Sequence, residues 1–400
     1  MNDTPKIPHG LPTDRGECPF DPPAELTRLR KERPISRMVY PDGHEGWLVT
    51  SYAAARAILA DPRFSSRAEL RRFPVPTPYP QDEPKPAAPG TISRLDPPEH
   101  THYRRMLTGK FTVRRLKQLE SGIRTITEDH IEAMRRHGPP VDLVQVFALP
   151  IPSLVICDLL GVPYADRDRF QRDTKVMFTL DAPRQEVNAA IVSLAGYIGE
   201  LIRRKRSEPG DDLLSDLIDG GELDDQELTA IGMTLLIAGH ETTANMLALG
   251  TFALLENPDQ VTALRESPAL VDQAVEELLR YLSVAHIGPG RAALEDVEID
   301  GHLIRKGEVV TISLPAANRD PRRFDDPDRL DVTRSTGGHL AFSHGIHQCL
   351  GQQLSRIELR IALAALLDSF PTLHLGVPAH EIPLRETSLV YGVDRLPVAW

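Results

Sequence analysis

Four side chains that can bind a metal lie close together near the C-terminal end of the chain: His339, His344, His347 and Cys349. A structural zinc site needs a closed set of four ligands, which usually includes closely spaced cysteine pairs. Cys349 is the single thiol of this stretch, and no second ligand pair occurs elsewhere in the sequence. A cysteine nucleophile would require a general base, and no residue specifically supplies one. Both chemistries are therefore disfavoured.

The surroundings of Cys349 favour a larger cofactor. The cysteine lies between Gly345 and Gly351, just before a helical pattern. A helix N-terminus stabilises a thiolate, so we expect the pKa of this thiol to be lowered. Glycines let the backbone pass close to a flat porphyrin, where a Cβ atom would collide. A thiolate ligand also increases the electron density on heme iron and favours O–O bond cleavage. The stretch therefore predicts that Cys349 is an axial ligand of heme iron.

A second candidate site lies in the middle of a long apolar helix that is predicted to begin at Asp224. Asp224 and Glu227 form a predicted capping box. Ala238 and Thr242 are four residues apart, so they share one face of the helix. A threonine within a helix commonly bonds back to the carbonyl four residues earlier. Glu241 beside it is harder to explain, because a buried carboxylate without a partner is costly.

Two further pairs have helical spacing. Glu277 and Arg280 are three residues apart, and His100 and Arg104 are four residues apart. Glu-Arg pairs at this spacing are common on helix surfaces, where each contributes only about 0.3 kcal/mol to helix stability. The second pair presents two donors on one face, which suits the binding of carboxylates.

Helices dominate the predicted secondary structure. Helical patterns run from residue 99 to about 282 and again from Leu350 to about Asp368. Ser267 and Pro268 are expected to start the helix that carries the Glu277 pair. Hairpin turns are predicted at Asp42-Gly43 and Asp300-Gly301. The sequence therefore predicts a mainly α protein with a smaller β part, built as one continuous domain over residues 1–400, with residues 1–17 as a flexible segment.

Composition limits the partners. The net charge of −11 argues against nucleic acid, because phosphate binding needs a basic surface. No apolar run approaches the ~18 residues of a membrane span, and the N-terminus lacks the apolar core of a signal peptide. The three scattered cysteines do not form a disulfide framework, so we expect a reducing cytoplasm.

The stretch "FSHGIHQCLG" resembles the heme-binding signature of the cytochrome P450 family. The match comprises Phe342, Gly345, His347, Cys349 and Gly351, with a serine after the phenylalanine where glycine is commoner. The segment "AGHETT" resembles the oxygen-activation segment of the family, and "ELLR" resembles its buried Glu-Arg pair. The resemblance extends from about residue 18 to residue 400, and it implies a triangular, prism-shaped fold with heme between the long central helix and the cysteine loop.

The resemblance also implies roles for residues of the long helix. Thr242 would hold oxygen at the heme, and Glu241 would relay the protons that O–O cleavage consumes. Ala238 and Gly239 would lie against the heme, with Gly239 leaving room for dioxygen.

Further roles follow from the same resemblance. Glu277 and Arg280 would support the cysteine loop, with Arg329 as a third member. The heme propionates would be bound by His100, Arg104, Arg291 and His347. The substrate pocket, assigned by family position, would include Phe73, Ile92, Met177, Phe178, Leu235, Val284, Ile287, Leu389 and Val390.

The implied activity is that of a heme monooxygenase. The sequence is similar to the actinobacterial branch that hydroxylates macrolides, vitamin D-like sterols, statin precursors and xenobiotics. Such an enzyme contains heme b and takes two electrons from NAD(P)H through a separate ferredoxin reductase and ferredoxin; we expect a monomer without a membrane anchor. A peroxide-driven peroxygenase and a heme-binding sensor remain alternatives.

A basic patch could receive the ferredoxin. Arg105, Lys110, Arg114 and Arg115 lie in the region of the first predicted long helix. An acidic ferredoxin would dock there through complementary charge. A solvated helix end would have the same composition, so the charges alone leave both interpretations open.

Overall fold

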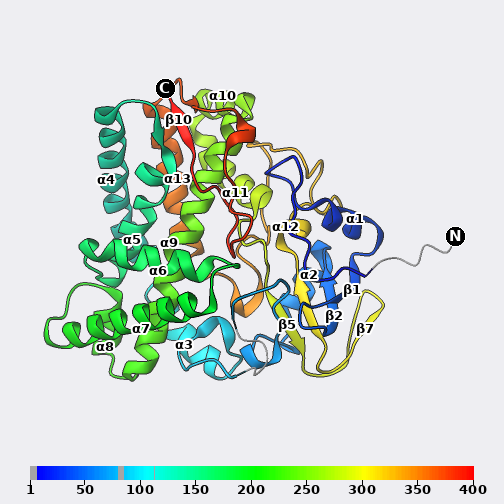
Figure 1. The fold of residues 1–400 in the computed structure, drawn as a ribbon. Coiled ribbons are helices and arrows are strands. Elements are labelled where there is room, and N and C mark those ends of the chain that lie inside the picture. The colour runs from blue at the N-terminus through cyan, green and yellow to red at the C-terminus, as the bar shows by residue number, and fades with distance from the viewer. Residues whose placement is uncertain (1–6, 80–84, 112) are drawn as a thin grey trace.

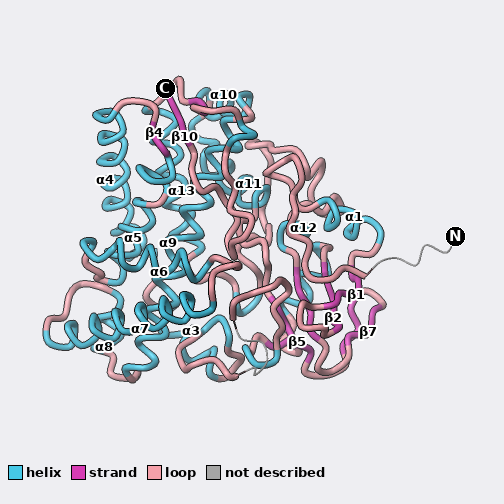
Figure 2. Tube along the Cα trace, in the orientation of Figure 1, coloured by secondary structure: helices cyan, strands magenta, loops and turns pink. Residues whose placement is uncertain are grey.

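The computed structural model describes residues 7–79, 85–111 and 113–400. Its helices gather on one side of the molecule, around α9, and most of its strands lie on the other side (Figures 1 and 2). The mainly α prediction is therefore confirmed.

The helical part contains long, mutually packed helices. α9 lies against α5, α7 and α13, and α13 also packs on α4 and α11. The α-helices are α1 Ala24–Glu32, α2 Tyr52–Ala60, α3 Glu99–Thr108, α4 Val113–His137, α5 Pro150–Leu160, α6 Arg167–Phe178, α7 Arg184–Ser207, α8 Leu213–Asp219, α9 Asp225–Leu255, α10 Pro258–Glu266, α11 Val271–Leu282, α12 Leu314–Ala317 and α13 Gln352–Ser369.

The central helix α9 begins as predicted. The Asp224 side chain accepts from the Glu227 N–H, and the Glu227 side chain accepts from the Asp224 N–H, which completes the capping box. The buried residues of α9 increase toward its C-terminal half, where every residue from Thr243 to Leu254 is buried. Because all faces of that half are covered, its sequence is mostly apolar on every side instead of amphipathic.

The strands form three small sheets. They are β1 Ile35–Val39, β2 Glu45–Val49, β3 Phe64–Ser65, β4 Val141–Asp142, β5 Gly290–Ala293, β6 Val297–Ile299, β7 His302–Ile304, β8 Val309–Ile312, β9 His374–Leu375 and β10 Pro397–Ala399. The largest sheet has the order β1-β2-β8-β5-β3, the second β4-β10-β9, and the third is the β6-β7 hairpin. Both predicted hairpins are present, since β1 pairs with β2 and β6 pairs with β7 in antiparallel register.

Two predicted helix starts are wrong by a few residues. Ser267 precedes a short 3₁₀ turn, Pro268–Leu270, makes no side-chain cap, and α11 follows only from Val271. The helix after the cysteine loop begins at Gln352 instead of Leu350. Helix ends depend on backbone hydrogen bonds that sequence patterns do not specify closely.

The N-terminal segment is only partly described. Residues 1–6 of the predicted flexible segment lie outside the described residues. From Gly10 onward the segment is packed: the Gly10 N–H donates to Val39 O, the Leu11 N–H donates to Pro74 O, and Leu11 and Arg15 are buried.

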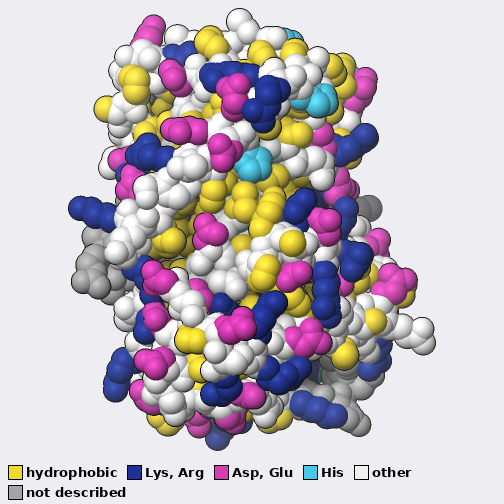
Figure 3. Space-filling view, turned by 90° about the vertical axis from the view of Figure 1, so that its left-hand side faces the viewer, with side chains coloured by type: hydrophobic (Ala, Val, Ile, Leu, Met, Phe, Trp, Pro, Cys, Tyr) yellow, Lys and Arg dark blue, Asp and Glu magenta, His cyan; other side chains and the backbone are white. Residues whose placement is uncertain are grey.

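Charged side chains of both signs are mixed over the face that carries α4 and α7, and hydrophobic side chains gather in a hollow near its middle (Figure 3). None of the helices in residues 7–79, 85–111 and 113–400 combines the length and apolar character of a membrane span.

Candidate active site

A cavity of about 540 Å³ lies between α9 and the cysteine loop. Cys349 is exposed towards this cavity. Ala238, Gly239 and Thr242 line it from α9. The structure therefore brings the two candidate sites of the sequence together around one space.

The cysteine loop is fixed by its backbone. The Cys349 N–H donates to Phe342 O at 2.9 Å. Gly345 has a φ of +73°, and a Cβ there would meet Leu59 O at 2.2 Å, so this glycine serves the packing of the loop on α2. At Gly351 a Cβ would meet nothing within 4 Å, and this residue lines the cavity. Gly351 is therefore the glycine that leaves the cavity surface open beside the thiol.

The predicted decrease in the pKa of Cys349 is wrong in its net direction. Burial raises the pKa of the thiol, while the Gly351 N–H, Arg104 and Arg356 act in the opposite sense. The backbone N–H groups at the start of α13 favour the thiolate, but the loss of hydration on burial affects the pKa of Cys349 more strongly and favours the thiol.

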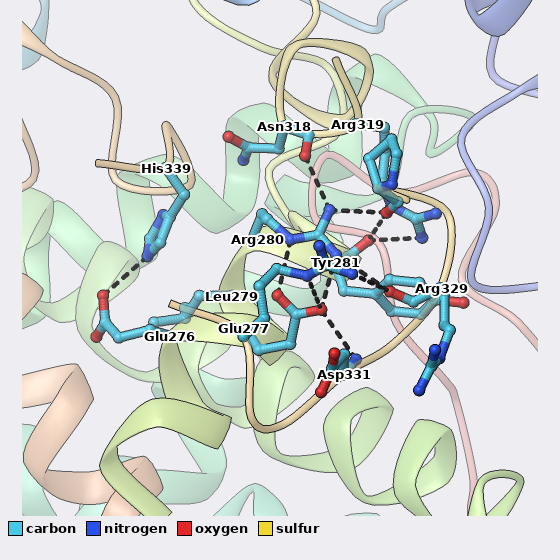
Figure 4. A network of polar contacts seen from close by, with 12 residues as sticks. Glu276, Glu277, Leu279, Arg280, Tyr281, Asn318, Arg319, Arg329, Asp331 and His339 are labelled. Carbon is cyan, nitrogen blue, oxygen red and sulfur yellow. Dashed lines mark hydrogen bonds and ion pairs between the residues drawn. The ribbon is translucent and has the colours of Figure 1, made fainter. Parts of the chain in front are cut away.

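Glu277 and Arg280 form a fully buried ion pair, with both side chains at 0% exposure. Arg280 Nε and Nη2 each donate to Glu277 at 2.8 Å, and Arg280 Nη1 donates to the carbonyls of Asn318 and Pro327 (Figure 4). Asn318 in turn accepts the Leu340 N–H through its side chain at 2.7 Å. The pair is thus connected to the segment that enters the cysteine loop, as the family resemblance implies.

The third member of this network is Arg334 and not Arg329. Arg334 Nε donates to Glu277 Oε1 at 3.1 Å, whereas Arg329 contributes only its carbonyl oxygen and its side chain is exposed. We call Glu277, Arg280 and Arg334 the glutamate cluster. The prediction failed because Arg329 and Arg334 lie in one irregular segment, where spacing does not reveal which side chain turns inward.

A second network next to it holds the other side of the loop. Glu276 accepts from His339 Nε2 at 3.0 Å and from both Arg356 Nε and Nη2. Arg356 also lies over the Phe342 ring, 4.6 Å from its centroid. Although burial opposes the effect, the hydrogen bonds from His339 and Arg356 lower the pKa of Glu276 to about 2.

The predicted propionate ligands lie near one another, together with a further arginine, and two of them, Arg104 and His347, line the cavity. We call His100, Arg104, Arg291, His347 and Arg71 the cation cluster. The rings of His100 and His347 lie 4.3 Å apart, and both nitrogens of His347 and Nε2 of His100 are buried without a hydrogen-bond partner. Burial, and then the neighbouring cations Arg291, His100, Arg71 and Arg104, lowers the pKa of His347 to about 3.

Two arginines of the cation cluster are likewise buried with few acidic groups nearby. Burial lowers the pKa of Arg291 to about 10, opposed by Asp96, and lowers that of Arg71 to about 9 with contributions from Arg94 and Arg291. The Asp96 carboxylate is already engaged by Ser65 Oγ and the Ser66 N–H. Buried cations and orphaned donors of this kind require an anionic partner.

On α9 the two expected catalytic groups differ. Thr242 lines the cavity, and its hydroxyl donates to Ala238 O at 2.8 Å. Glu241 is 4% exposed, does not line the cavity, and accepts from Arg385 Nη1 at 2.8 Å and Asn245 Nδ2 at 3.3 Å. The carboxylate that is unexplained in the sequence therefore has a partner, contributed by the last part of the chain.

Gly239 lines the cavity, where the sequence predicts it, and it also has a packing role. A Cβ there would meet Ile156 Cδ1 at 2.6 Å, so the glycine permits close contact between α9 and α5.

Six of the nine predicted substrate-pocket residues line the cavity: Phe73, Ile92, Leu235, Val284, Ile287 and Leu389. Met177, Phe178 and Val390 do not line it. Met177 and Phe178 instead offer their carbonyls to the Tyr79 hydroxyl and the Leu389 N–H. Val390 follows Leu389 directly and is buried in the protein interior.

Sequence reasoning missed several lining residues: Ser93, Phe111, Ile156, Leu159, Met246, Leu314, Leu354, Ser355 and Glu358. A signal existed for one of them. Glu358 falls in the apolar i, i+4, i+7 register of Leu354 and Ile361 on α13, which marks a charged residue on a buried face. No comparable signal marks Arg385.

A cysteine-bearing loop facing a long helix across a cavity, with buried cations on one side, defines a heme-thiolate protein. Residues 24–388 match the family model Cytochrome P450. The chain is 54% identical over 382 residues to cytochrome P450 105C1 of a Streptomyces species, which covers 95% of this chain and 96% of that protein. It is 44% identical over 410 residues to a vitamin D3 dihydroxylase of Streptomyces griseolus, covering 100% of both. The crystal structure of CYP105P1 in complex with filipin I is similar with a TM-score of 0.91 and 43% identity, covering 99% of each chain.

The chain therefore belongs to the cytochrome P450 family, in its actinobacterial branch, and is a monooxygenase. Family membership implies heme, and the residues present fit it. The cation cluster lacks anions that two propionates would supply, Cys349 faces the cavity, and Gly351 places no Cβ there. No group of three or more His, Cys, Asp or Glu residues in the described part of the chain is placed to hold a metal ion.

Proposed function

We propose that this enzyme hydroxylates an unactivated C–H bond of a lipophilic natural product or drug-like molecule, using O₂ and two electrons from NAD(P)H. The observation that carries the proposal is the cavity, in which the Cys349 thiol and the Thr242 hydroxyl share one largely apolar space. The vitamin D3 dihydroxylase among the relatives supports a lipophilic substrate. An apolar lining also excludes water from the reacting groups.

Heme b would be held by Cys349 at the iron and by the cation cluster at the propionates, with His347 and His100 as hydrogen-bond donors. When bound, the heme supplies the activation of dioxygen. The cation cluster would then lose its excess of unpaired donors, because each buried guanidinium or imidazole gains a carboxylate partner. This pairing orients the cofactor and couples its binding to the stability of the surrounding loop.

Thr242 and Thr243 of the "AGHETT" segment both line the cavity, and Thr242 is the residue to which the resemblance assigns the oxygen-binding role. In the structure its proton is donated to Ala238 O, and rotation of the hydroxyl would direct it into the cavity instead. Glu241 would deliver protons to this position only after its carboxylate leaves Arg385. The Leu389 segment and Arg385 belong to the same part of the chain, so we expect substrate contact with Leu389 to influence that ion pair.

We propose that the electrons pass through a ferredoxin reductase and a ferredoxin. Of the four basic residues expected to receive it, Lys110 and Arg115 are paired with Asp216, at 3.4 and 2.6 Å, and Arg105 is exposed. The side chain of Arg114 lies outside the described residues. Arg105 is therefore the best candidate among them for docking an acidic ferredoxin, and Arg105→Glu should slow ferredoxin-driven turnover without changing substrate binding.

Replacing Thr242 by Ala tests the proposed function. The variant should continue to consume NADPH, but product per NADPH should fall about tenfold as hydrogen peroxide is released, because the proton-handling hydroxyl is lost. Thr229→Ala is a matched control, since Thr229 lies on the same helix and bonds back to Asp225 O at 2.6 Å, away from the cavity. Unchanged coupling in Thr242→Ala would contradict the proposal. If peroxide alone supports the reaction equally well in both proteins, the peroxygenase alternative is favoured.

A further inference from the structure

Three threonines of α9 line the cavity, and one of them lies away from the segment expected to handle oxygen. Thr242 and Thr243 belong to "AGHETT", whereas Thr234 lies eight residues before Thr242. Thr234, Ala238 and Thr242 follow one another at steps of four residues, so they form one row on the face of α9 that borders the cavity. This row carries a hydroxyl at each end and a methyl group between them.

The Thr234 hydroxyl can accept a hydrogen bond without giving one up. The side chain is half-buried, and its proton is donated to Ala230 O at 2.7 Å. A hydroxyl that donates in this way still has lone pairs with which to accept. A ligand that brings an O–H group to Thr234 Oγ1 therefore gains a hydrogen bond while the bond to Ala230 stays in place.

The cavity wall around Thr234 offers a ligand no charge. The lining residues contributed by α9 and by the segment 284–289 are all uncharged. The charged side chains that line the cavity are Arg104, His347 and Glu358, which belong to α3, the cysteine loop and α13. A charged substrate group beside Thr234 would therefore lose its hydration without gaining a partner, whereas a neutral hydroxyl group would gain one.

A second hydroxyl residue lies on the segment that covers this part of α9. A Cβ at Gly90 would meet Glu227 O at 2.6 Å and Ala230 Cβ at 3.2 Å, so the backbone at Gly90 touches the turn of α9 just before Thr234. Ser93 follows three residues later and lines the cavity. Both hydroxyl residues therefore favour a polar substrate group at this end of the helix.

The spacing along α9 sets the distance between that group and the reacting bond. Each residue of an α-helix adds about 1.5 Å, so Thr234 lies about 6 Å from Ala238 and about 12 Å from Thr242 along the axis. Ala238 and Thr242 are the residues that the family resemblance puts against the heme. A substrate group held at Thr234 is therefore about 6–12 Å from the C–H bond that is attacked.

We propose that Thr234 is a specificity-determining residue that accepts a hydrogen bond from a hydroxyl group of the substrate. The substrate class is a neutral lipophilic alcohol whose hydroxyl lies about 6–12 Å from the carbon to be oxidised. The position of that carbon rests on the proposed function, whereas the contact with Thr234 concerns binding alone.

The first test measures binding to the ferric holoenzyme by calorimetry and needs no turnover. The probes are androstanol, a rigid steroid alcohol with its hydroxyl on ring A, and androstane, the same skeleton without the hydroxyl. Thr234→Val removes the acceptor at nearly constant volume, so the ratio of the androstanol affinity to the androstane affinity should fall at least about fivefold. Thr234→Ser should keep the wild-type ratio.

Thr229→Val is the matched control, because the Thr229 hydroxyl bonds back to Asp225 O at 2.6 Å and Thr229 does not line the cavity. This variant should bind both probes as the wild type does. An unchanged ratio in Thr234→Val, or a wild type that binds neither probe, would overturn the inference. If Thr234→Val does not retain heme, the same ratio measured in Thr234→Ala decides.

The second test uses ferredoxin-driven turnover of androstanol to examine the distance. The wild type should introduce the new hydroxyl in rings C or D, remote from the hydroxyl of ring A, and Thr234→Val should give a broader mixture of products. Predominant oxidation of ring A by the wild type would overturn the inference and leave the proposed function intact. A wild type that shows the expected affinity ratio but forms no product from any tested substrate would contradict the proposed function, while the binding contact of Thr234 would stand.

Discussion

The glutamate cluster and the cation cluster are both buried and charged, yet they are satisfied in opposite ways. Glu277 accepts from Arg280, Arg334 and the Asp331 N–H, and the Arg280 donors reach a carboxylate and main-chain carbonyls. His347, by contrast, has two unpartnered ring nitrogens among cations. A complete network stabilises the protein by itself, whereas an incomplete one indicates a ligand. The difference separates the structural charges of this enzyme from those that bind its cofactor.

The largest effect should come from breaking the complete cluster. Arg280→Ala leaves the buried Glu277 carboxylate without its main partner, which should cost about 3–5 kcal/mol of unfolding free energy. Urea unfolding of the purified protein measures this loss. Arg329→Ala is the control at an exposed side chain and should change stability by less than about 0.5 kcal/mol. Equal losses in the two variants would remove the distinction between Arg280 and Arg329.

Removing a charge from the cation cluster should not destabilise the apoprotein. Arg291→Gln removes a buried cation, so the apoprotein should be as stable as the wild type or more stable. Heme affinity should fall by about 10- to 100-fold, because a charge-assisted hydrogen bond contributes about 1.5–3 kcal/mol. Heme transfer to an excess of apomyoglobin measures the affinity. A variant whose apoprotein is destabilised as strongly as Arg280→Ala would show that both clusters are structural.

A buried histidine outside both clusters gives the smallest of these effects. His286 Nε2 donates to Ser388 O at 2.6 Å, and burial followed by the charge of Arg15 lowers the pKa of His286 to about 4. The unfolded chain binds a proton at this histidine near its ordinary pKa of about 6.5, whereas the folded chain does not until about 4, so stability falls as the pH decreases through this window.

The contribution of His286 to the free energy of unfolding should be about 2 kcal/mol smaller at pH 5 than at pH 7.5. Urea unfolding at the two pH values measures it, and His286→Gln should show a smaller decrease than the wild type. His374→Gln, at an exposed position, should behave as the wild type does. Identical pH dependence in all three proteins would show that His286 does not resist protonation.

The sequence allows much of this site to be predicted where residues lie in signatures or in regular helices. The capping box of α9, the Glu277–Arg280 pair and the grouping of His100 and His347 in one set follow from spacing and from family resemblance. Arg334 and Arg385 were not predictable, because irregular segments bring them to their carboxylates from far along the chain. Gly239 shows a further limit: its close contact with Ile156 depends on how two helices pack, which spacing within one helix does not reveal.

The central claim is that Cys349 binds heme iron as a thiolate in the cavity beneath Thr242. The most direct test is the absorption spectrum of the purified holoprotein after reduction and exposure to carbon monoxide. We expect a Soret band far to the red of that of ordinary heme–CO complexes, because the thiolate donates electron density to the iron. A Soret band at the ordinary position, or a Cys349→Ser variant with the same spectrum as the wild type, would contradict it.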